Sequence, residues 1–148
     1  MRAVLQRVTR ARVEVESRTV SEIGRGVLIF LGVQVGDGDA QAEALAKKVS
    51  GLRIFDDADG RMNLALAAVG GSYLVVSQFT LYADLSKGKR PGFEAALKPP
   101  ESERLYRLFC DRLALRSGRP VLRGEFGAMM RVELVNDGPA TFVVEQTS

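Results

Sequence analysis

The sequence predicts a single α/β domain in which two helices cover a largely antiparallel sheet that curls toward a barrel. The chain has 148 residues, a length that suits one compact domain. Short stretches with the period-two alternation of strands occur along the whole chain, and two longer stretches between them repeat their apolar residues at helical spacing. No repeat or linker divides this order, so we expect residues 1–148 to form one domain.

The first third of the chain predicts strands followed by a helix. Residues 3–8 and 11–16 alternate like two adjacent strands, which suggests an N-terminal hairpin. The apolar run 27–33 is far shorter than the ~20 residues that span a bilayer, so it predicts a buried strand. Asp39 then stands where it can cap a helix. That helix is defined by apolar residues at helical spacing, namely Ala42, Leu45, Ala46, Val49 and Leu52.

The rest of the chain alternates turns with strands and contains the second helix. Residues 56–60 resemble a calcium-binding loop but lack the glutamate that such a loop needs at its end, so they predict an ordinary turn. Residues 101–117 carry an apolar stripe and are followed by Gly118, which predicts a helix ending there. Further strands are expected at 121–126, around Val132 and Leu134, and at 140–145.

Composition excludes several kinds of site. The chain has no histidine and one cysteine, so Ser-His-Asp relays, Cys-His relays and intrachain disulfides are all ruled out. We expect no metal site and no cofactor. Cys110 lies among apolar residues, which indicates packing. The net charge of +3 permits an RNA partner but is too small to indicate one. The first residues lack the pattern of a secretory signal, so a cytoplasmic location is expected.

Polar residues interrupt the apolar stretch that begins at Tyr73. Ser77, Gln78 and Thr80 follow it, with Phe79 among them. Two interpretations fit: the strand leaves the core here with its hydroxyls bonded to neighbouring backbone, or these residues form the polar rim of an apolar pocket. Side chains alternate along a strand, so Ser77 and Thr80 share a site only if the strand bulges or ends between them.

A second polar motif, residues 136–141, indicates a turn between the last two strands. A purely structural role is one interpretation. The bond between Gly138 and Pro139 is of interest because an X-Pro bond can be cis, although the isomer does not follow from the sequence. Lys87, Lys89 and Arg90 lie in a loop rich in glycine and proline and offer contacts to phosphate; a solvated basic loop explains them equally well.

Seven segments spread over the whole length carry a resemblance to a known family. They are residues 1–8, 52–55, 62–64, 77–84, 90–91, 126–128 and 136–141. In this order they resemble the D-aminoacyl-tRNA deacylases of the bacterial and eukaryotic type. The most specific part is the pairing of Ser77-Gln78-Phe79-Thr80 with Gly138-Pro139 and Thr141. Relatives mostly have valine where this chain has Ala140, and an acidic residue where it has Met129.

The resemblance implies the fold of that family and hydrolysis of the ester that joins a D-amino acid to the 3′-terminal adenosine of tRNA, with glycyl-tRNA(Ala) as a further substrate. It also implies a homodimer with shared sites. A cis Gly138-Pro139 would enter the partner's pocket and exclude an L side chain, because its backbone is rigid. Arg7 would hold the partner's Gly-Pro, residues 77–80 would frame the ester and the terminal ribose, and the 2′-hydroxyl of the tRNA would assist the reaction.

Two alternatives stay open. One is a non-catalytic, translation-associated RNA-binding module that uses the basic residues. The other is a deacylase in which Thr80 attacks covalently; such a hydroxyl needs an activating base, no histidine is present, and Lys87 and Lys89 lie in a loop where desolvation is not expected. The expected partners are the 3′ end of aminoacyl-tRNA and a second copy of the chain, with neither membrane nor DNA among them.

Overall fold

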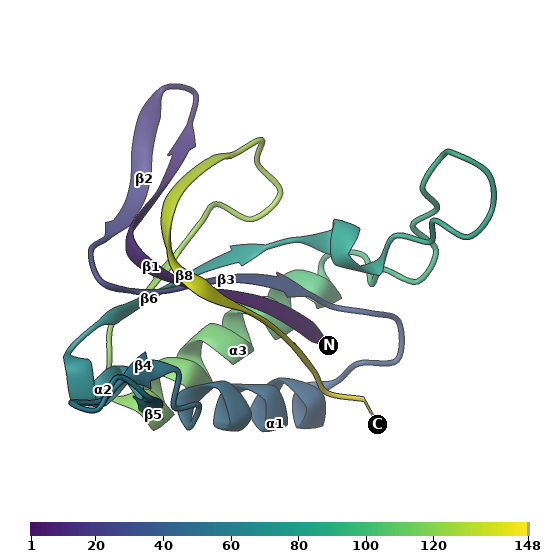
Figure 1. Cartoon of the computed structure of the whole chain (residues 1–148). Coiled ribbons are helices and arrows are strands. Elements are labelled where there is room, and N and C mark those ends of the chain that lie inside the picture. Colours follow the sequence, from purple (N-terminus) through teal and green to yellow (C-terminus); the bar gives the residue numbers. More distant parts are fainter. Residues whose placement is uncertain (148) are drawn as a thin grey trace.

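Six strands form one sheet in the computed structural model, which describes residues 1–147, and two long helices cover one face of that sheet (Figure 1). The strands of the sheet are β1 (Arg2–Val15), β2 (Arg18–Ile23), β3 (Gly26–Gly32), β6 (Ser72–Ser77), β7 (Val121–Arg123) and β8 (Arg131–Glu145). The covering helices are α1 (Asp39–Ser50) and α3 (Glu101–Ser117). The remaining elements are a small hairpin of β4 (Phe55–Asp56) and β5 (Met62–Leu64), the short helix α2 (Leu66–Val69) and the 3-10 helix η1 (Phe79–Tyr82). The predicted α/β domain with two covering helices is confirmed.

The sheet is mixed, whereas the sequence suggested a largely antiparallel one. Strand β1 is antiparallel to β2, β3 and β8, but β3, β6 and β7 are parallel to one another. Each of these parallel steps contains a helix between its strands, as parallel neighbours require. The edges β2 and β7 approach each other, since the Ser21 hydroxyl donates to the Arg123 carbonyl and Arg18 pairs with Glu125 at 3.1 Å. The predicted curling toward a barrel is therefore confirmed.

Strand β1 is one continuous strand where the sequence predicted two. Its first half, residues 2–8, pairs with β3, and its second half, residues 11–15, pairs with β2. The N-terminal hairpin therefore joins β1 to β2, and Glu16 and Ser17 turn the chain with φ of 50° and 64°. A strand of this length pairs with two neighbouring strands, one after the other along its length. The alternation of apolar and polar residues within β1 does not reveal this.

Strand β8 is also continuous, and the predicted turn at 136–139 is wrong. Asn136 pairs with Val8, and Thr141 pairs with Gln6. Residues 137–140 therefore oppose Arg7 alone, so the turn-forming residues produce a bulge rather than a reversal. Gly138 and Pro139 lie at this bulge and are exposed.

The helix boundaries are close to those predicted. Helix α3 has the expected bounds and ends at Gly118 with a φ of 65°. In α1 the capping residue is Gly38 rather than Asp39, because the Gly38 N–H donates to the Gln41 side chain at 2.8 Å. Asp39 is the first helical residue and pairs with Arg104 at 2.6 Å. Strand β7 ends at Arg123, before the predicted end, and the short α2 was not expected.

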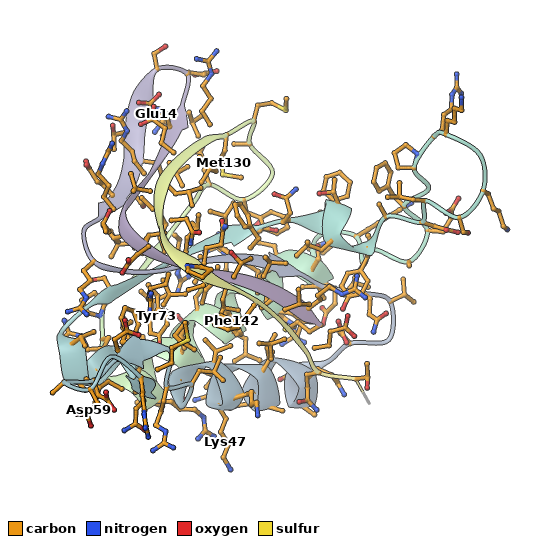
Figure 2. The ribbon with its side chains drawn as sticks, in the orientation of Figure 1. Glu14, Lys47, Asp59, Tyr73, Met130 and Phe142 are labelled. Atoms are coloured by element: carbon orange, nitrogen blue, oxygen red, sulfur yellow. The ribbon has the colours of Figure 1, made fainter. Side chains whose placement is uncertain are left out.

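The main core lies between the sheet and the two long helices. Figure 2 shows Tyr73 and Phe142 in this layer, where they belong to one hydrophobic cluster. The Tyr106 hydroxyl of α3 donates to the Val75 carbonyl at 2.7 Å and ties the helix to β6. Cys110 is fully buried, as its apolar surroundings predicted, and burial raises the pKa of its thiol to about 12. No helix among residues 1–147 is long and apolar enough to span a bilayer.

Candidate functional site

The segment Ser77 to Thr80 changes from strand to helix within four residues. Strand β6 ends at Ser77, Gln78 links the elements with φ −144° and ψ 85°, and η1 begins at Phe79. The Gln78 N–H donates to the Leu31 carbonyl at 2.8 Å, which fixes the turn against β3. Because the strand ends here, the alternation that would separate Ser77 from Thr80 is lost.

A cavity of about 710 Å³ lies at this edge of the sheet, a volume typical of small-molecule sites. Its walls come from the ends of β3 and β6, from η1, and from residues between 93 and 102 and between 126 and 132. Ser77, Gln78, Phe79 and Thr80 all line it. The strand ends at Ser77, as the first interpretation of this segment has it, and all four residues line an apolar cavity, as the second describes.

Glycine at position 32 lets η1 approach the sheet. A Cβ built there would lie 3.0 Å from the Leu81 Cβ, 3.1 Å from the Gln78 carbonyl oxygen and 3.1 Å from Tyr82 Cδ2. These separations are tighter than ordinary van der Waals contacts, so a side chain at this position would push η1 outward. Gly32 therefore sets the position of the 77–80 segment.

Thr80 has an amide as its hydrogen-bonding partner. The Gln78 Nε2 donates to the Thr80 Oγ1 at 2.5 Å. An amide nitrogen of this kind accepts no proton, and no other side chain among residues 1–147 bonds to the Thr80 hydroxyl. The arrangement orients Thr80 as a polar group of the rim and gives it no general base.

Two aromatic rings meet at the cavity wall. Phe79 and Phe93 lie edge to face with centroids 5.1 Å apart, and they are 55% and 37% exposed. Rings that are this accessible and already paired offer an apolar surface to a planar ligand. Phe93 was missed from the sequence, although an aromatic residue within a loop of breakers was an available signal.

Lys98, Ser102 and Met130 also line the cavity and were not predicted as site residues. Met129, noted in the sequence only as a departure from the relatives, lines it too and is 90% exposed. Met130 belongs to the chain that leads into β8 (Figure 2). These residues come from two segments far from residues 77–80 in sequence, and no local pattern connects them.

Arg7 is buried and ties three segments together. Its Nε donates to the Asp137 carbonyl and its Nη1 to the Ile54 carbonyl, both at 2.9 Å. The carboxylates of Asp56 and Asp137 lie 3.3 and 3.4 Å from the same guanidinium. Within one chain, Arg7 thus anchors the β8 bulge next to Gly138.

The peptide bond between Gly138 and Pro139 is cis. Gly138 is needed where it stands, since a Cβ there would lie 2.6 Å from the Asn136 Oδ1. The Asn136 amide cannot easily move away, because its Nδ2 donates to the carbonyls of Arg7 and Ala140 at 3.0 and 3.3 Å. Ala140 is 3% exposed. Arg7, Gly138 and Pro139 do not line the chain's own cavity.

The basic residues Lys87, Lys89 and Arg90 are exposed on a loop that extends from the body of the molecule beyond η1 (Figure 1). Asp84 and Gly92 close this loop with two backbone hydrogen bonds of 2.7 and 2.9 Å. None of the three lines the cavity. The structure therefore brings residues 77–80 together and leaves the basic loop outside.

Comparisons with known proteins agree with the resemblance seen in the motifs. A D-aminoacyl-tRNA deacylase of a Geobacter species is 54% identical over 145 residues, which are 98% of this chain and 97% of that protein. Its counterpart in Geobacter sulfurreducens is 52% identical over 148 residues, or 100% and 97% of the two chains.

Solved structures show the same fold. A structure titled c-Myc DNA Unwinding Element Binding Protein matches with a TM-score of 0.92 and 36% identity over 100% of both chains. A probable eukaryotic D-amino acid tRNA deacylase matches with a TM-score of 0.77 and 20% identity, over 97% and 98% of the chains. A family model described as D-Tyr-tRNA(Tyr) deacylase covers residues 4–145. The chain therefore belongs to the D-Tyr-tRNA(Tyr) deacylase family.

Proposed function

We propose that this protein hydrolyses the ester bond of D-aminoacyl-tRNA and releases the free D-amino acid and tRNA. The observation that carries the proposal is the cavity at the end of β6, whose rim contains all four residues of the 77–80 motif. Full-length relatives at more than half identity bear the name of this activity. An apolar cavity with a few convergent polar groups suits a bound amino acid ester.

Matched D- and L-tyrosyl-tRNA test the activity. We expect the protein to release tyrosine from the D form at a rate well above the spontaneous one, and to leave the L form intact. A Phe79→Ala variant, which removes an exposed ring from the rim, is expected to lose most of the activity. No release from the D form would refute the proposal and would favour the RNA-binding module.

For the chemical step, we propose that water attacks the ester carbonyl with assistance from the 2′-hydroxyl of the terminal ribose. The carbonyl–oxygen bond to the ribose breaks, the ribose oxygen takes a proton, and the amino acid leaves with the hydroxyl from water. The amide partner of Thr80 supports this route, because it provides no base for a covalent nucleophile.

One protein variant and one altered substrate separate the chemical routes. Thr80→Ala is expected to retain substantial turnover, whereas D-tyrosyl-tRNA that lacks the terminal 2′-hydroxyl is expected to react slowly. Loss of all turnover in Thr80→Ala, together with normal reaction of the 2′-deoxy substrate, would instead support covalent attack by Thr80.

We further propose a homodimer in which Gly138-Pro139 of one subunit enters the partner's cavity and excludes an L side chain. The exposure of both residues and their absence from their own chain's cavity support this arrangement. Because the rigid backbone of Gly138-Pro139 would exclude only an L side chain, it would admit any D-amino acid and also glycine, which has no side chain. We therefore propose glycyl-tRNA(Ala) as a further substrate. A cytoplasmic location accords with a tRNA substrate.

Mixed dimers test the shared site. A Phe79→Ala homodimer and a Gly138→Ala homodimer are each expected to lose most of the activity. If one site needs residue 79 from one subunit and residue 138 from the other, their mixed dimer contains one intact site and regains activity. Absence of recovery, or a fully active monomer in sedimentation, would refute the shared site.

The basic loop is proposed to contact the tRNA backbone. Neutralising Lys87, Lys89 and Arg90 together should raise KM for D-tyrosyl-tRNA and flatten its salt dependence, because phosphate contacts release counterions. Neutralising Lys47 and Lys48 on α1 together with Arg116 on α3, three exposed residues outside the loop, is the charge-matched control.

A further inference from the structure

Arg2 makes three side-chain contacts that the proposed chemistry does not use. Its Nη1 donates to the Leu81 carbonyl at 2.5 Å, and its guanidinium carbon lies 4.7 Å from the centre of the Tyr82 ring. Its Nε donates to the Glu145 carboxylate, also at 2.5 Å. Leu81 and Tyr82 belong to η1, whereas Arg2 does not line the cavity. Arg2 therefore contacts this short helix without taking part in the cavity wall.

The register of the sheet explains how Arg2 reaches η1. Arg2 is the first residue of β1 and is paired with Gly32 on β3 and with Glu145 on β8. Paired residues of neighbouring antiparallel strands point to the same face of a sheet. The Cβ that Gly32 lacks would point at Leu81 and Tyr82. Helix η1 therefore lies over the face to which Arg2 and Glu145 also point.

The Leu81 carbonyl needs a donor from outside the helix. In a 3-10 helix the N–H three residues further along would bond to it, and that residue is Asp84. The Asp84 N–H donates instead to the Gly92 carbonyl at 2.7 Å, where it closes the basic loop. The Arg2 guanidinium takes its place, as side chains do at helix ends. Because a helix of four residues has little stability of its own, its position depends on contacts of this kind.

We infer that Arg2 is a positioning residue for the proposed hydrolysis. The inference rests on the proposed function, because Phe79 and Thr80 of the rim lie on the same short helix. Arg2 fixes the carboxyl end of η1, and Glu145 orients the guanidinium. A partly exposed ion pair of this kind adds little stability by itself. Removal of the guanidinium should therefore lower turnover in a protein that is still folded.

Single-turnover hydrolysis of D-tyrosyl-tRNA tests this role. Arg2→Met keeps an apolar stem and removes the donors, and we expect the rate constant at saturating protein to fall about tenfold to a hundredfold, the effect of a displacement of about 1 Å. The protein concentration that gives half the maximal rate should not change, because Arg2 touches no substrate. Arg2→Lys, which keeps one donor for the Leu81 carbonyl, should recover part of the rate. This variant also reports on the role if Arg2→Met folds poorly.

Arg12→Met is the matched control. Arg12 lies on the same strand and is paired with Glu133 of β8, as Arg2 is paired with Glu145. The two arginine side chains are 34% and 33% exposed, and the Arg12–Glu133 ion pair measures 2.6 Å. Within the described part of the chain, the Arg12 guanidinium pairs with Glu14 and Glu133 and not with η1. We expect the rate constant of the control to equal that of the unaltered protein.

A fluorescent probe at position 79 reports on η1 without catalysis. The chain has no tryptophan, so Phe79→Trp introduces a single indole next to Phe93, whose ring centre lies 5.1 Å from that of the native ring. Displacement of η1 should separate the two rings, shift the emission to longer wavelength and make the indole more accessible to acrylamide. We expect this change when Arg2→Met is combined with Phe79→Trp, and no change when Arg12→Met is combined with it.

Three results would overturn the inference. One is a rate constant for Arg2→Met equal to that of Arg12→Met, and another is an emission spectrum that Arg2→Met leaves unchanged. The third is a loss that appears only as a higher half-maximal concentration, which would make Arg2 a substrate-binding residue instead. If the unaltered protein does not hydrolyse D-tyrosyl-tRNA, the proposed function is refuted, and the emission spectra still show whether Arg2 holds η1.

Discussion

At the scale of single residues, the bulge that carries Gly138 and Pro139 is held by side chains with several polar contacts. Arg7 gives its guanidinium to two carbonyls and two carboxylates, and Asn136 holds the backbone on both sides of the β8 bulge. Both sets of contacts converge on the residues next to Gly138. The exposed selector proposed here is thus supported from beneath by groups that have little freedom to move.

Gly138→Ala should disturb this support. The new Cβ would contact the Asn136 Oδ1 at 2.6 Å and force out a side chain held by two hydrogen bonds. We expect a loss of about 1–2 kcal/mol in the free energy of unfolding and a loss of about a hundredfold in D-tyrosyl-tRNA hydrolysis from misplacement of the bulge. Chemical denaturation and single-turnover assays measure these. Gly24→Ala, where the Cβ meets no atom within 4 Å, should change neither.

Arg7→Lys should destabilise the fold despite keeping the charge. A lysine has no planar fork, so the carbonyls of Ile54 and Asp137 would lose donors. We expect the free energy of unfolding to fall by about 1–3 kcal/mol. Urea denaturation provides the measurement, and Arg10→Lys, at an exposed position of the same strand, should match the unaltered protein. If Arg7→Lys and the unaltered protein unfold at the same urea concentration, the anchoring role of Arg7 is contradicted.

At the scale of elements, the site is formed where a strand stops and a short helix starts. The end of β6 at Ser77 and the start of η1 at Phe79 put four consecutive side chains on one cavity. The close approach of η1 to β3 at Gly32 is what sets their height above the sheet. Small displacements of η1 should therefore affect activity as well as stability.

Gly32→Ala tests the position of η1. Its Cβ would lie within 3.1 Å of atoms in Gln78, Leu81 and Tyr82, and relief of that contact moves the 77–80 segment. We expect kcat/KM for D-tyrosyl-tRNA to fall by about tenfold to a hundredfold, with a stability loss of about 1–3 kcal/mol. Full activity with a normal KM would show that η1 adapts without cost.

At the scale of the whole molecule, the core between the sheet and the helices contains a thiol and a phenol that burial keeps in their neutral, protonated form. Burial raises the pKa of Cys110 to about 12 from an ordinary value of 9.0, and that of Tyr73 to about 12 from 10.0. In the unfolded chain these groups ionise at their ordinary values. Between those values and about 12 the unfolded state therefore binds fewer protons than the folded state, so stability falls as pH rises through this window.

The free energy of unfolding should therefore decrease between pH 8 and pH 10. The slope from Cys110 alone is about 1.4 kcal/mol per pH unit above its unfolded pKa. Urea titrations at the two pH values measure the change, and Cys110→Ala should reduce it. If the free energy of unfolding of Cys110→Ala falls as steeply with pH as that of the unaltered protein, the thiol does not contribute to this pH dependence. The same burial should protect Cys110 from iodoacetamide at pH 8 until the protein unfolds.

Local patterns in the sequence were enough to predict the two covering helices, most of the strands and the membership of residues 77–80 and 138–139 in one family pattern. Helical and strand periodicity are local properties, and a motif needs only residue identity and spacing. The bounds of α3 and the burial of Cys110 followed from such local signals.

The way in which these elements combine depends on contacts between distant parts of the chain. Strand pairing joins residues far apart in the chain, so the parallel order of β3, β6 and β7 and the continuity of β1 and β8 left no local mark. For the same reason Phe93, Lys98 and Ser102 were not predicted as neighbours of Ser77. The turn residues at 136–139 became a bulge because β1 pairs with β8 on both sides of them, and pairing energy along two long strands outweighs a local preference to reverse.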